Sequence, residues 1–250
     1  MVDIWFTLTA LVTEAAAKNL TCTHGSNVFS CPACTELLPT SFWNRMTWTR
    51  FAPEKNTYHV TALTGCLRKS YLDVTSPAAD TVESAWAKLR GSLLHYAGRS
   101  LGWNELRVKM TFELDDETIS IIGFIDAFDP DTGTLFDLKT TRFVKWQKEK
   151  GFIPRENHAA QVQCYYTILE TYGIPVSRLV LVYVDDKEIV PVAVPIGNRR
   201  EWMMRRAAQL HRAFTKHEVP KPEVGSSCKY CPHRETCPQV EGVKFGEAMS

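Results

Sequence analysis

The segment that most constrains the fold of this chain is residues 121–141, IIGFIDAFDPDTGTLFDLKTT. Apolar and β-branched residues fill both of its ends, and the tetrapeptide Pro130–Gly133 between them has the composition of a tight turn. Two strand-like runs around such a turn predict a β-hairpin. The segment therefore places a pair of antiparallel strands in the middle of the chain.

Three ionisable residues lie on this predicted hairpin. Asp126 ends its first arm, and Asp137 and Lys139 lie on the second arm, where alternate residues point to the same face. Pairing of the arms can bring both carboxylates and the amine together at the rim of the sheet. Two hard oxygen ligands suit Mg²⁺ or Mn²⁺, and a lysine beside the metal can orient and help deprotonate a water, as metal-assisted phosphodiester hydrolysis requires. The pattern taken alone also occurs by chance in strands, and Asp131 fits ordinary turn chemistry.

Length and composition fit a globular protein with one main domain. Its composition is 44% hydrophobic and 23% charged, and its net charge of +1 means that a nucleic-acid footprint has to be a local patch. We expect an N-terminal appendage over residues 1–50, a core over 51–241 and a tail over 242–250. No apolar run is long enough to span a bilayer, and Asp3 stands where a signal peptide has basic residues. We therefore expect a cytoplasmic protein with no membrane partner.

The eight cysteines are expected to be metal ligands rather than disulfides in that compartment. The first group is Cys22, His24, Cys31 and Cys34, which lie within 13 residues and end in a C-x2-C pair. Two such turns can close a tetrahedral Zn²⁺ site. The alternatives are that Cys31 and Cys34 alone are coupled, or that all the thiols are free. The spacing is not a standard zinc-finger pattern, and zinc is the favoured interpretation of the four ligands.

Hydrophobic periodicity predicts the remaining elements. Helices are expected at residues 3–20, 81–100, 156–172 and 199–217, and strands at residues 105–114, 178–184 and 188–194. In the helix 81–100, an apolar stripe includes Trp86, Leu93 and Tyr96, and Gly91 suggests a close backbone approach. His95 lies on that stripe; it is either an ordinary helix histidine or a further ligand for the metal held by the carboxylates.

Two other helices carry informative residues. Gln161 and Tyr165 are four residues apart in the helix 156–172 and therefore share a face, while Cys164 between them is expected to be a packed core thiol. In the basic helix 199–217, Met203 and its helical repeats are expected to face the core, and Arg206 is expected to face solvent.

A basic segment follows the hairpin. Its members can hold phosphates or stack on unpaired bases; they are Arg142, Lys145, Trp146, Lys148 and Lys150, with Phe143 and Arg155 beside them. An ordinary solvated loop is the alternative. The position of the segment next to the carboxylates favours DNA.

The chain ends in a second cysteine group. Cys228, Cys231 and Cys237 form C-x2-C-x5-C, which leaves one position of a four-ligand site open. Cys66, at the start of a predicted helix, can supply that ligand and tie the last segment to the beginning of the core.

Together these motifs resemble the PD-(D/E)xK nuclease superfamily in its RecB-like branch. Within it they resemble the iron–sulfur subgroup, which includes the CRISPR-associated exonucleases of the fourth Cas family and related phage and repair nucleases. The resemblance covers about residues 60–240. It rests on five motifs in the family's order, namely Gly91-x-x-x-His95, Gly123-Phe-Ile-Asp126, Asp137-Leu-Lys139, Gln161-x-x-x-Tyr165, and Cys66 with Cys228-x2-Cys231-x5-Cys237. The N-terminal Cys/His segment is not part of the shared core.

The resemblance implies a fold and a set of roles. The fold is α/β with a mixed sheet, the restriction-endonuclease-like core, with flanking helices and a C-terminal cluster segment. His95, Asp126, Asp137 and the carbonyl of Leu138 would bind Mn²⁺ or Mg²⁺, and Lys139 would position the attacking water. Gln161 and Tyr165 would hold the DNA strand near the scissile phosphate. The four cysteines of the second group would ligate a 4Fe–4S cluster.

These expectations leave three functional hypotheses. The first is a metal-dependent DNA nuclease, expected to act as an exonuclease on single strands or duplex ends, in CRISPR spacer acquisition, DNA repair or phage DNA processing. Its protein partners would be a CRISPR integrase or recombination proteins. The second is a non-catalytic DNA-binding or scaffold module that keeps the fold. The third is a protein in which both cysteine groups bind zinc.

Overall fold

The computed structural model describes residues 20–22, 24–27, 30–37, 54–100 and 105–237. The chain divides into two compact units. One comprises Met1–Ala52 and Ala78–Leu93, and the other comprises Pro53–Pro77 and Leu94–Ser250. The helix expected at residues 3–20 and the tail 242–250 lie outside the described residues. None of the described helices has the length and apolarity needed to cross a membrane.

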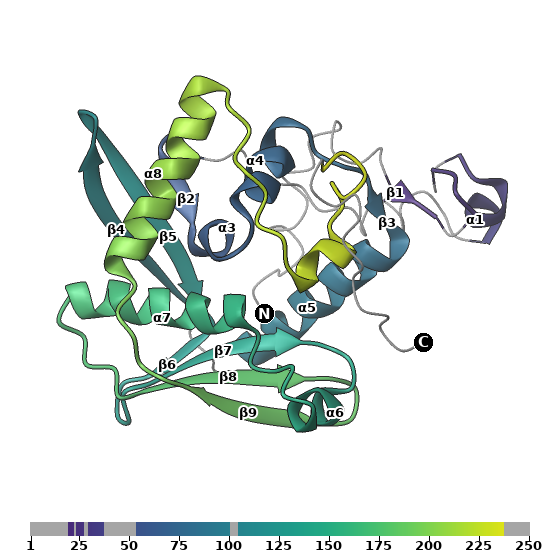
Figure 1. Cartoon of the computed structure of the whole chain (residues 1–250). Coiled ribbons are helices and arrows are strands. Elements are labelled where there is room, and N and C mark those ends of the chain that lie inside the picture. The colour runs from purple at the N-terminus through teal and green to yellow at the C-terminus, as the bar shows by residue number, and fades with distance from the viewer. Residues whose placement is uncertain (1–19, 23, 28–29, 38–53, 101–104, 238–250) are drawn as a thin grey trace, which may run out of the picture. The chain divides into compact units, whose positions relative to one another are not determined.

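The strands of the larger unit form two sheets (Figure 1). They are β2 (Thr57–His59), β4 (Leu106–Leu114), β5 (Glu117–Ile125), β6 (Ala127–Asp129), β7 (Thr134–Thr140), β8 (Arg178–Val184) and β9 (Ile189–Val194). In the first sheet β5 lies between β2, to which it is parallel, and β4, to which it is antiparallel. The order of the second sheet is β6-β7-β8-β9, and its central pair β7–β8 is parallel. The sheets are thus mixed, as the sequence predicted.

The predicted hairpin is present, but its first arm differs from the prediction. β6 and β7 are antiparallel, and Asp129 pairs with Thr134 across the predicted turn. Gly133 has a φ of +62°, which glycine adopts without strain. Asp126 does not end this arm: the chain bends there, after β5 of one sheet and before β6 of the other. The alternation of apolar and polar residues could not predict this bend, because the residues of β5 and β6 form one continuous apolar run in the sequence.

The other predicted strands are confirmed within one residue at their ends. The link between β4 and β5 is the turn at Asp115 and Asp116, and both residues have positive φ, +50° and +64°. Such values are those of a type I′ turn, whose twist matches that of the two strands it joins.

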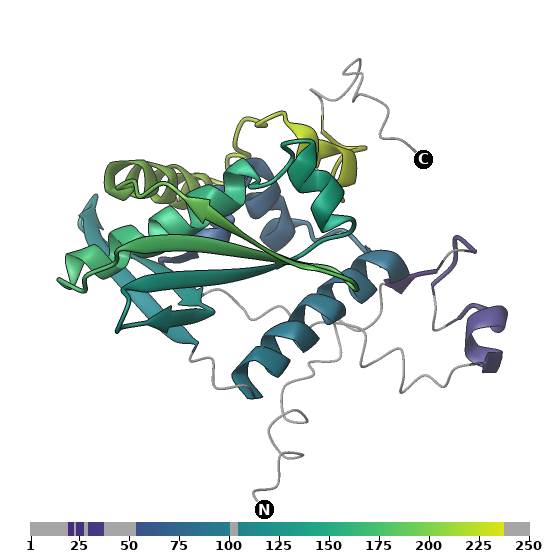
Figure 2. The ribbon, with the colours of Figure 1, turned by 90° about the horizontal axis from the view of Figure 1, so that it is seen from below.

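Helices pack on these sheets around one hydrophobic core. They are α3 (Val60–Thr64), α4 (Leu67–Thr75), α6 (Val144–Glu149), α7 (Glu156–Thr171), α8 (Arg200–Lys216) and the 3₁₀ helix η1 (Ser226–Tyr230). α7 lies along the second sheet, between that sheet and α8 (Figures 1 and 2). It contributes buried residues on several sides, including Val162, Cys164 and Ile168, each 0% exposed. The core thiol predicted at Cys164 is confirmed.

One burial prediction was wrong, and the apolar stripe of one helix lies partly in solvent. The helix α5 (Val82–Ser100) forms as expected, but Trp86, Leu93 and Tyr96 of its apolar stripe are exposed, whereas Ala85 is buried. The stripe's periodicity identified the helix without identifying its buried face. In α8, Arg206 was expected to face solvent, yet its side chain is only 12% exposed because it is held in a hydrogen-bond network described below.

The smaller unit has its own apolar cluster. It contains β1 (Leu20–Thr21), α1 (Pro32–Leu37), β3 (Asp80–Thr81) and the first part of α5, and β1 pairs in parallel with β3. Cys22, Cys31 and Ala85 are buried together, and Val82 and Leu89 pack against them. The cysteine-bearing segment is therefore docked on the start of α5.

Candidate active site

Asp126 is held at the bend between the two sheets by both of its carboxylate oxygens. The Nδ1 atom of His95, on α5, lies 2.8 Å from Oδ1 of Asp126. The backbone N–H of Leu138, on β7, donates a hydrogen bond of 2.7 Å to Oδ2. The carboxylate raises the pKa of His95 by accepting its hydrogen bond, which favours the imidazolium form. The structure therefore brings together the three predicted residues His95, Asp126 and Leu138.

Asp137 and Lys139 share one face of β7, as strand alternation requires. Nζ of Lys139 lies 2.6 Å from Oδ2 of Asp137, and the side chain of Asp137 is only 2% exposed. Its other oxygen, Oδ1, accepts a hydrogen bond of 3.2 Å from the Gln161 amide on α7. Burial raises the pKa of Asp137, and the charge of Asp126 adds to this, while the ammonium of Lys139 opposes it.

These groups supply donor types that suit a hard divalent cation. Oδ2 of Asp137 is buried and lies 2.6 Å from the Lys139 ammonium. Two carboxylates and an imidazole are ligands that Mn²⁺ and Mg²⁺ use in proteins. In the described structure each carboxylate is paired with a basic side chain, so that a metal ion would replace these pairings rather than enter an open cage. A cation would also remove the cost of burying Asp137 ionised.

Gln161 and Tyr165 meet the site from α7, and both are buried. The amide of Gln161 donates to Asp137 and also, at 2.7 Å, to the Tyr165 hydroxyl. The ring of Tyr165 lies against the backbone of β5 at Gly123, where an added Cβ would be 2.4 Å from its Cε1 atom. These contacts position Asp137 and the strand; contact of the two side chains with DNA stays a prediction.

His158 lies beside the site, and no role was predicted for it from the sequence. Its Nδ1 atom lies 2.9 Å from the hydroxyl of Tyr183, and Tyr183 is the register partner of Lys139 on β8. Burial lowers the pKa of His158 to about 3, and the charges of Lys139 and Arg155 act in the same direction. His158 is thus a neutral imidazole at neutral pH. The signal available in the sequence was its position three residues before Gln161, on the same helical face.

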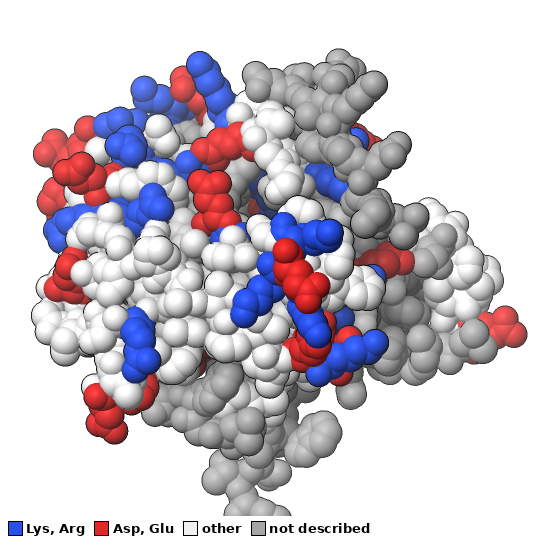
Figure 3. Space-filling model, turned by 60° about the horizontal axis from the view of Figure 1, so that its bottom comes forward, with Lys and Arg blue, Asp and Glu red and all other residues white. Residues whose placement is uncertain are grey.

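The basic segment after β7 folds into α6 and leaves its charged side chains in solvent. Arg142, Lys145, Lys148 and Lys150 are exposed, and so are Phe143, Trp146 and Phe152. Asp185, after β8, accepts a hydrogen bond of 2.9 Å from the N–H of Val144 and thereby caps the helix. On the face shown in Figure 3, basic and acidic side chains are interspersed, in keeping with a net charge of +1.

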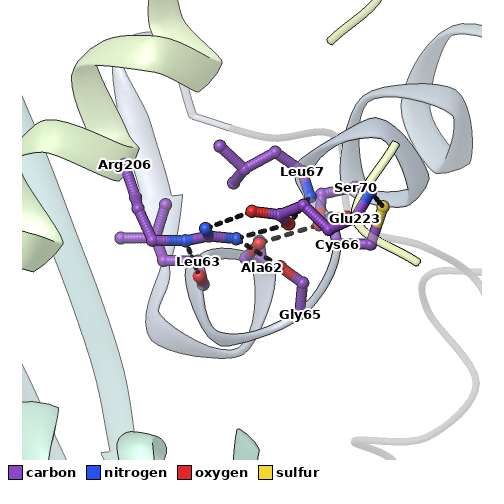
Figure 4. A network of polar contacts seen from close by, with 8 residues as sticks. All are labelled: Ala62, Leu63, Gly65, Cys66, Leu67, Ser70, Arg206 and Glu223. Carbon is purple, nitrogen blue, oxygen red and sulfur yellow. Dashed lines mark hydrogen bonds and ion pairs between the residues drawn. The ribbon is translucent and has the colours of Figure 1, made fainter. Parts of the chain in front are cut away.

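Cys66 lies at the start of α4 in a polar network that the sequence did not reveal (Figure 4). Arg206 of α8 donates to the backbone carbonyls of Leu63 and Gly65 and pairs with the carboxylate of Glu223. Glu223 in turn accepts a hydrogen bond of 3.0 Å from the Leu67 N–H, and its own N–H lies 3.5 Å from Sγ of Cys66. The network connects α8 and the segment after it to the turn that carries Cys66.

The remaining cysteines of the second group lie in and after η1. Cys228, Cys231 and Cys237 are partly exposed, and Cys228 Sγ accepts a hydrogen bond of 3.4 Å from the Gly225 N–H. His233 beside them lies 2.9 Å from Asp73 of α4, which holds this segment on the helix that begins at Cys66. Burial raises the pKa of Cys231, and the charges of Cys228 and Cys66 contribute.

The first cysteine group is compact. Among the described residues, one group of three or more Cys, His, Asp or Glu ligand atoms lies within 4.8 Å of one another: Cys22, His24, Cys31 and Cys34. The structure thus brings together all four residues predicted for zinc. Neither the second cysteine group nor the set His95, Asp126 and Asp137 meets this limit in the described part of the chain.

Comparison with known proteins gives the family and the fold of the chain. The crystal structure of SSO0001 superimposes on the chain with a TM-score of 0.56 and 21% sequence identity, covering 75% of this chain and 88% of that one. Similarity at this level shows a shared fold. No curated protein sequence matches the chain. The sequence model of the PD-(D/E)XK nuclease superfamily matches residues 53–238, the range that contains the paired carboxylates, Lys139 and the second cysteine group, and the chain therefore belongs to the PD-(D/E)XK nuclease superfamily.

Proposed function

We propose that this chain is a Mn²⁺- or Mg²⁺-dependent deoxyribonuclease that hydrolyses phosphodiester bonds in single strands or at duplex ends. The observation that carries the proposal is a pair of ion pairs, Lys139–Asp137 on β7 and His95–Asp126 at the bend between the two sheets, which the hydrogen bond from the Leu138 N–H to Asp126 links. Membership of the nuclease superfamily supports a nucleic-acid substrate. The exposed cations and aromatic rings around α6 favour a strand with unpaired bases.

Each residue has a role in this proposal. Asp126, Asp137 and His95 would hold the metal, with the Leu138 carbonyl as a further ligand. When bound, the metal supplies Lewis-acid activation of the phosphate and of a water. Once a metal replaces its pairing with Asp137, Lys139 would lose its own proton to solvent and, as a neutral amine, would orient that water and accept a proton from it. Gln161 fixes the orientation of Asp137 by its hydrogen bond and is in turn fixed by Tyr165.

We propose further that Cys66, Cys228, Cys231 and Cys237 ligate a 4Fe–4S cluster with a structural role. The cluster would join α4 to the last described segment, which Arg206, Glu223 and the Asp73–His233 pair already hold together without metal. Ligands so far apart in sequence restrict the unfolded chain when they are joined. A Cys231→Ser variant is expected to lose the brown colour and to unfold at lower temperature. A reversible rate difference between oxidised and reduced protein of unchanged stability would contradict a purely structural role.

The test of the nuclease proposal is digestion of end-labelled single- and double-stranded DNA with Mn²⁺, Mg²⁺ or no metal. Metal-dependent shortening from the ends of unpaired strands is expected, and the label position gives the polarity. Internal cleavage of both substrates would contradict the exonuclease assignment. Binding without cleavage in every metal would favour the non-catalytic module instead. The biological context, whether CRISPR spacer acquisition, repair or phage DNA processing, would follow from protein partners, an integrase or recombination proteins.

A further inference from the structure

The N-terminal cysteine group has a geometry that its sequence spacing alone could not establish. Nδ1 of His24 lies 3.6 Å from Sγ of Cys22, 3.5 Å from Sγ of Cys31 and 3.8 Å from Sγ of Cys34. All four ligand atoms are within 4.8 Å of one another. One imidazole nitrogen thus stands at nearly equal distances from three sulfurs, which is the relation of one corner of a tetrahedron to the other three.

The size of this tetrahedron fits a single zinc ion. With Zn–S bonds of about 2.3 Å and a Zn–N bond of about 2.0–2.1 Å, a regular tetrahedron has N···S edges of about 3.6 Å. The three measured edges, 3.5, 3.6 and 3.8 Å, agree with this value. A set of three thiolates and one imidazole is also the soft-to-borderline donor set that selects zinc over the hard cations suited to Asp126 and Asp137.

The backbone presents these ligands from two tight turns. The Cys22 N–H donates to the Ser26 carbonyl, and the Gly25 N–H donates to the Cys22 carbonyl, both at 2.9 Å. Gly25 has a φ of +76°, which suits glycine in this turn. At the second turn, the Cys34 N–H donates to the carbonyl of Cys31 at 3.0 Å. Each turn therefore brings one pair of ligands together.

The cluster also has an apolar support. Cys22 is 6% exposed and Cys31 is 4% exposed, and both are buried with Ala85 of α5. Val82 and Leu89 complete this support. The ligands are thus packed on the beginning of α5, next to the β1–β3 pair.

We propose that Cys22, His24, Cys31 and Cys34 form a structural Zn²⁺ site that fixes the segment 20–37 on β3 and the first turns of α5. Four protein ligands close the coordination shell and leave no position for a substrate or a water, which separates this site from a catalytic zinc. The site lies outside residues 53–238, the range that matches the nuclease superfamily. It is therefore independent of the proposed nuclease activity.

The first experiment needs no variant. Full-length protein purified anaerobically with zinc in the medium is analysed by zinc K-edge X-ray absorption, which iron does not disturb because the edge is element-specific. A shell of three sulfurs and one nitrogen is expected. A shell of four sulfurs would place the zinc at the second cysteine group, and a shell of nitrogen and oxygen alone would show an adventitious surface ion; either result overturns the proposal.

The second experiment locates the site by variants of the full chain. Zinc and iron are measured by mass spectrometry in Cys31→Ser, Cys34→Ser and His24→Ala, with Cys164→Ala as the matched control because Cys164 is a buried thiol of the core without a metal role. About one zinc per chain is expected in the wild type and the control, and a loss of most of it with unchanged iron in the three variants. Zinc retained in all three variants, or zinc and iron lost in equal proportion, overturns the proposal.

The structural role has its own readout. Limited proteolysis of wild-type protein is compared before and after zinc removal by a chelator, with cleavage sites read by mass spectrometry. New cleavage within residues 20–37 is expected after chelation, with residues 105–237 unchanged. Identical cleavage patterns in zinc-loaded and zinc-free protein would show that the metal does not hold this segment.

Discussion

The aromatic ring of Tyr165 occupies the space that a side chain at position 123 would need. A Cβ atom at Gly123 would be 2.4 Å from Cε1 and 2.9 Å from Cδ1 of that ring. Two residues from different motifs, one on β5 and one on α7, are therefore complementary in shape. Their contact sets the distance between the helix that carries Gln161 and the strand that leads to Asp126.

A Gly123→Ala substitution is expected to lower the free energy of unfolding by about 1–3 kcal/mol, because the added methyl group overpacks the interface between β5 and α7. Cleavage is expected to fall as well, since α7 carries Gln161. The measurement is chemical denaturation together with DNA digestion. Gly65→Ala is the matched control, because its Cβ would come no closer than 3.9 Å to a neighbouring atom.

A double variant separates overpacking from a general loss of the glycine. Gly123→Ala combined with Tyr165→Leu should recover part of the stability lost in Gly123→Ala, because the smaller side chain makes room for the methyl group. Strictly additive losses would show that the ring contact is not the cause.

A Lys139→Met substitution is expected to lower the cleavage rate by about 10²–10⁴-fold, the range found when a positioned proton-transfer group is lost. Methionine keeps most of the length of the side chain and removes its charge beside Asp137. DNA affinity, measured by fluorescence anisotropy with Ca²⁺ in place of Mn²⁺, should change little. Lys216→Met is the control, an exposed lysine at the end of α8. A Lys139→Met protein that cleaves at the wild-type rate would remove lysine from the mechanism.

Replacing Arg206 by Ala is expected to destabilise the protein by about 1–3 kcal/mol, because the carbonyls of Leu63 and Gly65 lose a charged hydrogen-bond donor. The midpoint of thermal unfolding measures this effect. Arg205→Ala, which changes the exposed neighbouring residue, should leave the midpoint nearly unchanged.

The same network predicts an effect on the proposed cluster. Glu223→Ala removes the acceptor for the Leu67 N–H and is expected to lower the iron content, since this contact holds the turn at Cys66. Full iron content in Glu223→Ala would show that the turn is held by other contacts.

The cap of α6 predicts a dependence on pH. Hydrogen bonding from the Val144 amide, with those from Lys187 and Glu188, lowers the pKa of Asp185 below its usual value. A lowered carboxyl pKa means that the cap stabilises the fold above the pKa of the unfolded chain and is lost as the pH falls through the folded value. The amide resonance of Val144 should therefore shift in acid. In Asp185→Asn this titration should disappear, and a persisting shift would assign it to another group.

The sequence predicted some structural features of this protein and missed others. The elements were predicted well because their periods are clear, and the pairing of Asp137 with Lys139 followed from strand alternation alone. Local patterns could not show that the apolar run through Asp126 is divided between two sheets, because that division depends on β2 and β4 pairing with β5. They also misplaced Arg206, whose burial depends on partners more than 140 residues away. The apolar stripe on α5 could not show which face of the helix is buried, because a period of 3.6 residues is compatible with a helix whose apolar residues stay in solvent.

The position of Asp126 between β5 and β6 has a thermodynamic consequence. Its carboxylate connects the sheet that contains β5 with the sheet that contains β7, and the two sheets otherwise meet through side-chain packing. A ligand that binds there therefore adds its binding free energy to the stability of both sheets. At a free metal concentration 100 times the dissociation constant this linkage amounts to about 2.7 kcal/mol. Amide protons of β5 and β7 should then exchange more slowly in the presence of metal, and the outermost strand β9 should respond least. The free metal concentration would thus affect the rigidity of the molecule as well as its catalytic activity.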